Sequence, residues 1–163
     1  MHYLFTKLDY AKNSTEQYNQ LANQLHALLS GEKNLYANLS NTSALLNQFF
    51  DRINWVGFYL VDNDELVLGP FQGLPACIRI PFGKGVCGTA ANTKESIIVA
   101  DVNAFPGHIA CDAASQSEIV VPIVLNGAIF GVLDIDSPEL NRFTEDDRIG
   151  LEKVVEVLIN HIH

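Results

Sequence analysis

The chain has 163 residues, 48% of them hydrophobic and 18% charged, and 10 Lys and Arg against 19 Asp and Glu give a formal net charge of −9. This length suits one domain over residues 1–163, and the composition is too apolar for a disordered chain. An acidic chain without a Lys/Arg run repels phosphate, no apolar stretch reaches the roughly 18 residues that cross a bilayer, and the first residues lack a signal-peptide pattern. We therefore expect a cytoplasmic protein that binds neither nucleic acid nor membranes.

Two amphipathic helices are predicted first, over about 14–30 and 34–50. In the first, Ser14 opens a SxxQ capping pattern ahead of leucines at helical spacing, and Gly31 follows its end. In the second, leucines and one of the two terminal phenylalanines form the buried stripe. Both helices could support a homodimer through their apolar faces.

Strands are predicted where the hydrophobic period changes from helical spacing to two. They cover 54–62, 65–71, about 78–80, 97–100, 118–125 and 128–136. The 63–64 turn (Asn-Asp) and the 126–127 turn (Asn-Gly) join two pairs of strands as hairpins. A capping pattern at Thr144 opens a terminal helix. This order predicts an α+β fold, an antiparallel sheet with the amino-terminal and carboxy-terminal helices packed on one face.

Three cysteines, Cys77, Cys87 and Cys111, are too few and odd in number for a structural disulfide framework without a secretion signal. Cys111 lies in the polar segment 103–117, and loops of about fifteen residues are usually functional or mobile. If residues 113–115 form a helical turn, its dipole favours the Cys111 thiolate. The alternative is an unreactive, half-buried cysteine on a surface loop.

Two other kinds of site are not expected. The glycine-rich segment 83–88 lacks the GxxxxGK[ST] pattern of a phosphate-binding loop, and it predicts a tight turn into a short helix with Cys87 near its start. His108 and the cysteines lack the local ligand pairs of a zinc site, so we expect no bound metal.

Two acidic side chains lie near the end of the predicted strand 128–136, the second strand of the 126–127 hairpin. Alternation places Asp134 and Asp136 on one face, where mutual repulsion would keep one of them protonated. A regular two-residue hairpin pairs Glu118 with Ile135, on the wrong face, whereas a bulge at Pro122 or a three-residue turn brings Glu118 opposite Asp134. The alternative is a set of solvated charges at strand ends.

Aromatic side chains share one face of the first predicted strand. Trp55, Gly57 and Tyr59 alternate with apolar residues, and the missing side chain of Gly57 leaves a slot for a small apolar group. The alternative is that both aromatics simply belong to the core.

Taken together, these motifs resemble the free methionine-(R)-sulfoxide reductases, which are single GAF domains. The resemblance covers most of residues 50–145 and is carried by NWVGFYL, FGKGVCGTAA, HIACDAASQSEIVVPI and GVLDIDSP. The three cysteines, ten and then twenty-four residues apart, also match this family, whereas most GAF domains lack them.

The resemblance implies an oxidoreductase that reduces free L-methionine (R)-sulfoxide and acts in the response to oxidative stress. It implies that Cys111 is the attacking thiolate, that Cys77 resolves the intermediate through a disulfide with Cys111, and that Cys87 has an exchange or an alternative catalytic role. The implied substrate-binding residues are an acidic set and an aromatic pair that holds the substrate methyl: Glu118, Asp134, Asp136, Trp55 and Tyr59.

The implied reaction has clear physical requirements. The sulfoxide oxygen needs a proton from a neutral carboxyl group, and backbone N–H groups of residues 112–115 could bind the substrate carboxylate. Cys111 becomes a sulfenic acid, a second thiol forms a disulfide, and thioredoxin restores the dithiol as an external reductant, without a bound cofactor. The acidic surroundings raise the pKa of Cys111, so a local donor or dipole must offset them.

Two other classes of function remain open from the sequence. A non-catalytic GAF sensor would bind a small ligand in the same pocket, and a redox sensor would form the same disulfide with peroxide. Stereospecific turnover distinguishes the enzyme from both.

Overall fold

The computed structural model describes residues 5, 7 and 9–162, and a six-stranded antiparallel sheet forms its centre. The strands are β1 (Trp55–Asp62), β2 (Glu65–Gly73), β3 (Arg79–Pro81), β4 (Ile97–Val99), β5 (Ser117–Leu125) and β6 (Ala128–Ser137). Their order across the sheet is β3-β2-β1-β6-β5-β4. The hairpins expected at 63–64 and 126–127 are both present, and the predicted α+β class is confirmed.

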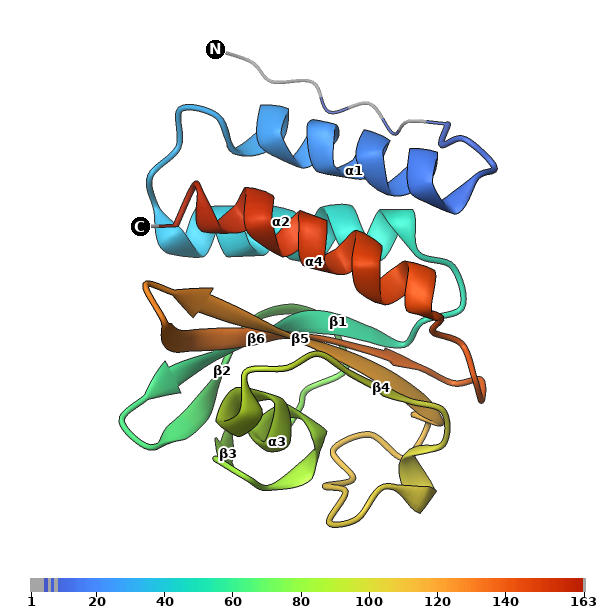
Figure 1. Cartoon of the computed structure of the whole chain (residues 1–163), viewed down its shortest axis with the longest axis vertical. Coiled ribbons are helices and arrows are strands. Elements are labelled where there is room, and N and C mark those ends of the chain that lie inside the picture. The colour runs from blue at the N-terminus through green and yellow to red at the C-terminus, as the bar shows by residue number, and fades with distance from the viewer. Residues whose placement is uncertain (1–4, 6, 8, 163) are drawn as a thin grey trace.

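Helices cover both faces of the sheet (Figure 1). They are α1 (Ser14–Leu29), α2 (Leu35–Phe49), α3 (Gly85–Thr93), the short 3-10 helix η1 (Val102–Ala104) and α4 (Glu145–Ile159). As expected, α2 and α4 pack on one face of the sheet, whereas α1, expected on the same face, forms an outer layer over them (Figure 1). The short helix α3 and the segment before β5 lie on the opposite face (Figure 1). In the described part of the chain, no helix is both long and apolar enough to span a membrane.

Side chains of the preceding residues cap the starts of α1, α2 and α4. The capping residue of α1 is Asn13, whose Oδ1 accepts a hydrogen bond from the N–H of Glu16, so the expected cap at Ser14 is wrong by one position. At the start of α4, Thr144 and Asp147 form the reciprocal capping box that the sequence predicted.

A bulge follows a regular turn in the hairpin of β5 and β6. The 126–127 turn has both residues at positive φ, 51° and 81°, as a two-residue type I′ turn requires. The pairing shifts by one residue between Ile123 and Val124, which leaves Phe130 as an extra residue of β6. The sequence offered a bulge at Pro122 of β5, but the bulge in the structure lies at Phe130 of the partner strand β6.

The position of this bulge decides which residue pairs with Glu118. An extra residue in β6 moves the register away from Ile135 in the direction of Asp136, and the structure pairs Glu118 with Asp136. The expected pairing with Asp134 is wrong, although Glu118 still shares a face with both aspartates, because side chains alternate along a strand.

Each face of the sheet has its own apolar cluster. On the helical face, Val56 and Phe58 of β1 and Leu133 and Ile135 of β6 belong to one cluster with apolar side chains of α1, α2 and α4. On the other face, Trp55 and Tyr59 belong to a smaller cluster with α3 and neighbouring segments. The aspartates of β6 alternate onto this second face, so the sheet is a rigid support for polar groups beneath α3.

Candidate active site

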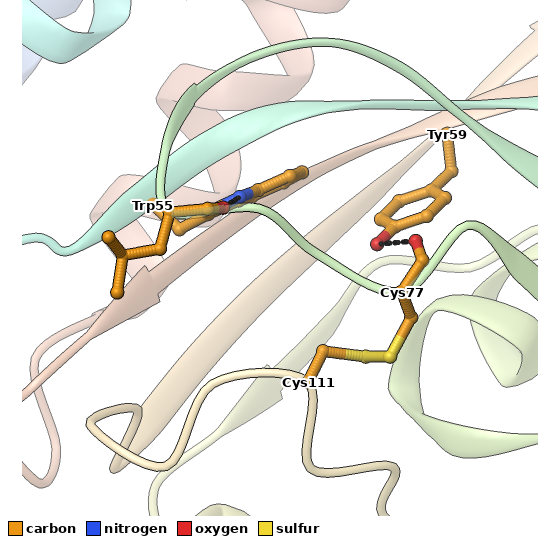
Figure 2. The surroundings of a disulfide bond; sticks show 5 residues. Trp55, Tyr59, Cys77 and Cys111 are labelled. Atoms are coloured by element: carbon orange, nitrogen blue, oxygen red, sulfur yellow. Dashed lines mark hydrogen bonds between the residues drawn. A yellow bond between two sulfur atoms is a disulfide. The ribbon is translucent and has the colours of Figure 1, made fainter.

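A disulfide bond joins two segments that cover the second face of the sheet (Figure 2). Cys77 follows β2, and Cys111 lies in the segment between η1 and β5. Their Cα atoms are 5.4 Å apart. The structure therefore contains the disulfide that the resemblance implied, while Cys87 on α3 is a free, buried thiol.

The two aromatic side chains of β1 hold the Cys77 segment in place. The hydroxyl of Tyr59 donates a hydrogen bond to the carbonyl of Cys77 at 2.9 Å (Figure 2). The indole N–H of Trp55 donates to the carbonyl of Leu74 at 3.2 Å. Burial and the nearby acids raise the pKa of Tyr59, so its hydroxyl remains a donor. Both aromatics are therefore buried anchors as well as part of the pocket wall.

The slot expected above Gly57 is not open. A Cβ atom at Gly57 would lie 2.2 Å from the Cβ of Phe71, so β2 approaches β1 closely at this point. The rings of Trp55 and Tyr59 stack with their centroids 5.8 Å apart, which leaves no room for a group between them. A small apolar group would have to lie against these rings, on their pocket side.

Asn54 holds the Cys111 segment against the start of β1. Its Nδ2 donates to Oδ2 of Asp112 at 3.0 Å and to the hydroxyl of Ser115 at 3.1 Å. Its Oδ1 is buried and has no hydrogen-bond partner among the described residues. Asn54 thus joins β1 to the turn that follows Cys111.

This turn is not the helical turn expected from the sequence. The N–H of Ser115 donates to the carbonyl of Asp112, and the N–H of Ala114 donates to Oδ1 of Asp112, which together make one tight turn. The helix dipole invoked for Cys111 is therefore missing. Among the described hydrogen bonds, none uses the N–H groups of Asp112 and Ala113, which leaves two donors beside Cys111.

Three carboxyl groups meet beneath the disulfide. Glu118 and Asp134 are buried, with 6% and 5% of their surfaces exposed, and Asp136 is partly buried. They come from adjacent strands, since Glu118 pairs with Asp136 across β5 and β6. The alternative of solvated strand-end charges is therefore excluded by the burial of Glu118 and Asp134.

Burial and mutual repulsion decide the protonation of these groups. Burial first, then the charge of Asp134, raises the pKa values of Glu118 and Asp136 well above their ordinary values. Burial also raises the pKa of Asp134, but hydrogen bonds from Glu118 and Cys87 and the nearby His108 oppose this shift. The most easily ionised member is therefore Asp134, with Glu118 as a neutral donor beside it.

Cys87 belongs to the same cluster. Burial, followed by the negative charges of the acids, raises the pKa of its thiol well above the ordinary value. Donor atoms of Cys87, Glu118 and Asp134 lie within 4.8 Å of one another, close enough to ligate one cation. Because all three have raised pKa values, a metal would have to displace protons to bind there.

One pocket brings together nearly all the residues singled out from the sequence. Seven of the eight line its wall: Trp55, Tyr59, Cys87, Cys111, Glu118, Asp134 and Asp136. Cys77 is attached to the pocket through its bond to Cys111. His108, considered only as a zinc ligand, and Ser115 also line this wall. Asn54 was missed, because its partners are 58 and 61 residues away in the chain and no local pattern reveals them.

Comparisons with known proteins agree on one family. A model of the GAF domain matches residues 40–162. A protein of Escherichia coli (strain K12) named free methionine-R-sulfoxide reductase is 54% identical over 143 residues, which cover 88% of this chain and 87% of that protein. A protein of the same name from Saccharomyces cerevisiae is 48% identical over 154 residues, covering 90% of this chain and 86% of that protein.

A solved structure is similar over nearly the whole chain. The structure of free methionine-R-sulfoxide reductase from Neisseria meningitidis, in complex with its substrate, is 45% identical and superposes with a TM-score of 0.90. The match covers 99% of this chain and 95% of that one.

Proposed function

Because the chain belongs to the GAF-domain family of free methionine-R-sulfoxide reductases, we propose that it reduces free L-methionine (R)-sulfoxide to L-methionine. The observation that carries this proposal is the Cys77–Cys111 disulfide beside a cluster of carboxyl groups whose pKa values burial raises. A reductase needs both a thiol pair to supply two electrons and an acid to protonate the departing oxygen.

In the proposed first step, the Cys111 thiolate attacks the sulfoxide sulfur. The oxygen takes a proton and is transferred to the Cys111 sulfur, which becomes a sulfenic acid while methionine leaves as a thioether. The thiol of Cys77 then attacks the sulfenic sulfur, water departs, and the disulfide seen in the structure forms. The Cα separation of 5.4 Å in the bonded form lies within the ordinary range for a disulfide.

Glu118 is the proposed proton donor. It lies on β5 opposite Asp136 of β6, hydrogen-bonds to both aspartates, and has a pKa raised well above the ordinary value by burial and by the charge of Asp134. The ionised Asp134, held by Glu118 and Cys87, is the group suited to bind the substrate ammonium. Cys87 then acts as a neutral hydrogen-bond donor, because its raised pKa disfavours the thiolate.

The remaining groups of the substrate have candidate partners in the same pocket. The N–H groups of Asp112 and Ala113 are suited to bind its carboxylate. The faces of Trp55 and Tyr59 form the apolar wall for its methyl group. Such contacts need both a free amine and a free carboxylate, so we expect a sulfoxide within a peptide to be excluded.

The disulfide must be reduced before another turnover. We assign this step to a thioredoxin in the cytoplasm, a compartment whose reductants keep dithiols reduced. No bound cofactor is required, since the electrons pass through the cysteines.

Thioredoxin-coupled NADPH oxidation tests this function directly. Turnover is expected with free L-methionine (R)-sulfoxide and not with the (S) epimer or a peptide-bound sulfoxide. The Cys111→Ser variant should lose activity. A folded, reduced protein that turns over none of these substrates would be a sensor, and the proposal would be wrong.

A further inference from the structure

We propose that the protein that reduces the Cys77–Cys111 disulfide docks on an apolar surface around Cys77 and attacks the Sγ atom of Cys77, not that of Cys111. This inference rests on the proposed function and names the docking site and the attacked atom. The occupant is a dithiol protein of the thioredoxin class. We define the docking surface by the exposed residues Leu74, Pro75 and Ile78 beside Cys77 and Ala110 beside Cys111.

Large apolar side chains are exposed next to Cys77. Among the described residues, five large hydrophobic side chains are largely exposed to solvent, and two of them, Leu74 and Ile78, lie within three residues of Cys77. Their exposed fractions are 63% and 67%. Exposed apolar groups beside a reactive bond are typical of a surface that a partner covers.

Two segments without charged residues meet at this disulfide. Residues 66–78 and 102–111 contain no Asp, Glu, Lys or Arg in a chain of net charge −9. The disulfide brings these two segments side by side (Figure 2). Within these two segments a partner meets no charged side chain, whereas an acidic surface would repel an acidic partner.

The position of the two sulfur atoms favours attack at Cys77. Cys111 lines the substrate pocket with the carboxyls, whereas Cys77 is not part of that wall. Two hydrogen bonds to carbonyl groups fix the segment around Cys77: its own carbonyl accepts from the hydroxyl of Tyr59, and the carbonyl of Ile78 accepts from the N–H of Leu68. The docking surface is thus held in a defined place.

The disulfide is reduced in two successive thiol–disulfide exchanges. A thiolate of the reductant attacks Sγ of Cys77, the S–S bond breaks, and its electron pair leaves on Cys111 as a thiolate. The second thiolate of the reductant then attacks the first sulfur atom of the reductant, which is bound to Cys77 in the mixed disulfide. This releases Cys77, which takes a proton from water. The reductant loses two electrons, and Cys111 is returned to the pocket in its attacking form.

The first test compares two reductants. In the Ile78→Ser variant, we expect kcat/KM for thioredoxin to fall about tenfold, because an exposed apolar contact is removed. Turnover driven by dithiothreitol should be unchanged, because the side chain of Ile78 lies outside the pocket wall. Leu140→Ser is the matched control, since Leu140 is 54% exposed and lies beyond β6. The conservative variant Ile78→Val should retain thioredoxin-driven turnover.

The second test identifies the attacked sulfur. The oxidised protein is mixed with a thioredoxin whose second cysteine is replaced by serine, quenched with acid, alkylated and mapped by mass spectrometry. We expect the mixed disulfide on Cys77 and the alkyl label on Cys111. A mixed disulfide on Cys111 would overturn the assignment.

A substrate-free measurement keeps this inference separate from the proposed function. The rate at which thioredoxin reduces the disulfide of the oxidised protein needs no sulfoxide, and Ile78→Ser should lower it about tenfold. If dithiothreitol-driven turnover is absent from the wild type, the proposed function fails while this rate still tests the docking surface. An unchanged rate in Ile78→Ser would overturn the docking surface. A shift of the sedimentation coefficient by Ile78→Ser would assign the surface to self-association and also overturn it.

Discussion

At the scale of residues, the site depends on acids that the fold keeps neutral. Glu118 and Asp136 come from adjacent strands, and burial together with the charge of Asp134 raises their pKa values. Ionising all three would place like charges side by side in a buried site, so protons are retained instead. Glu118 is hydrogen-bonded to both aspartates, so a single substitution there tests the whole cluster.

The first prediction concerns the pH dependence of turnover. Because the proton donor must be neutral and its pKa is raised, kcat should fall as the pH rises through that raised pKa. Glu118→Gln should lower kcat by about a hundredfold or more and remove this alkaline decline. Rates measured across the pH range with dithiothreitol as reductant provide the check. A variant that keeps wild-type kcat and the same decline would exclude Glu118 as the donor.

The second prediction concerns stability. A carboxyl with a raised folded-state pKa contributes stability that is complete below its unfolded pKa of about 4.3 and is lost as the pH rises through the folded pKa. Glu118→Gln cannot lose this proton, so the melting temperature of the variant should rise relative to the wild type as pH increases above about 4.3. Thermal unfolding across the pH range measures this difference, with the exposed Glu156→Gln as control. A difference that is independent of pH would show that folding does not raise the pKa of Glu118.

The third prediction concerns Asn54, which joins β1 to the turn after Cys111. Asn54→Ala removes both hydrogen bonds from Nδ2, and we expect kcat to fall about tenfold, because small displacements of a nucleophile are costly. Asn19→Ala, at an exposed position of α1, is the matched control. If kcat in Asn54→Ala equals that of the control, the bonds to Asp112 and Ser115 do not position Cys111.

At the scale of elements, the sheet separates stability from chemistry. One face packs on α2 and α4 in an apolar layer, and the other supports the carboxyls, the aromatics and both disulfide-linked segments. The bulge at Phe130 sets this division for Glu118, because without it Glu118 would pair with Ile135 and face the helical layer. A single extra residue near the turn therefore determines whether the acids meet.

The fourth prediction tests the packing of α1 on α4. A Cβ atom at Gly150 would lie 2.1 Å from the ring of Tyr18, which is buried and donates a hydrogen bond to Asp147. Alanine normally stabilises a helix relative to glycine by about 1 kcal/mol. Gly150→Ala should nevertheless destabilise the protein by about 1–3 kcal/mol, because the ring must move.

Denaturant unfolding measures this effect, and a double-mutant cycle with Tyr18→Ala isolates the contact. In the Tyr18→Ala background, Gly150→Ala should cost much less or become favourable. An equal cost in both backgrounds would show that Tyr18 is not the cause.

At the scale of the whole molecule, local patterns in the sequence predicted the elements well. The alternation at Trp55 and Tyr59, the Asn-Gly turn and the capping box at Thr144 each depend on neighbouring residues, and each is present. The family resemblance, not the local chemistry, supplied the pairing of Cys77 with Cys111, because no rule of spacing selects between three cysteines.

What could not be predicted depends on contacts between distant segments. The bulge at Phe130 needs the actual strand register, and two alternatives at Pro122 and the turn were equally consistent with the local pattern. The slot at Gly57 is closed by Phe71 of another strand. The turn after Cys111 is fixed by Asn54, so the side chain that shapes the loop lies outside it.

The most direct test of the central claim is a single turnover without reductant. Reduced protein is mixed with excess free L-methionine (R)-sulfoxide, and methionine and remaining thiols are counted. The wild type should release one equivalent of methionine per chain and join Cys77 to Cys111. Cys77→Ser should release the same amount and keep a sulfenic acid at Cys111 that dimedone traps. Absence of methionine from the reduced wild type, or a full equivalent from Cys111→Ser, would contradict the account.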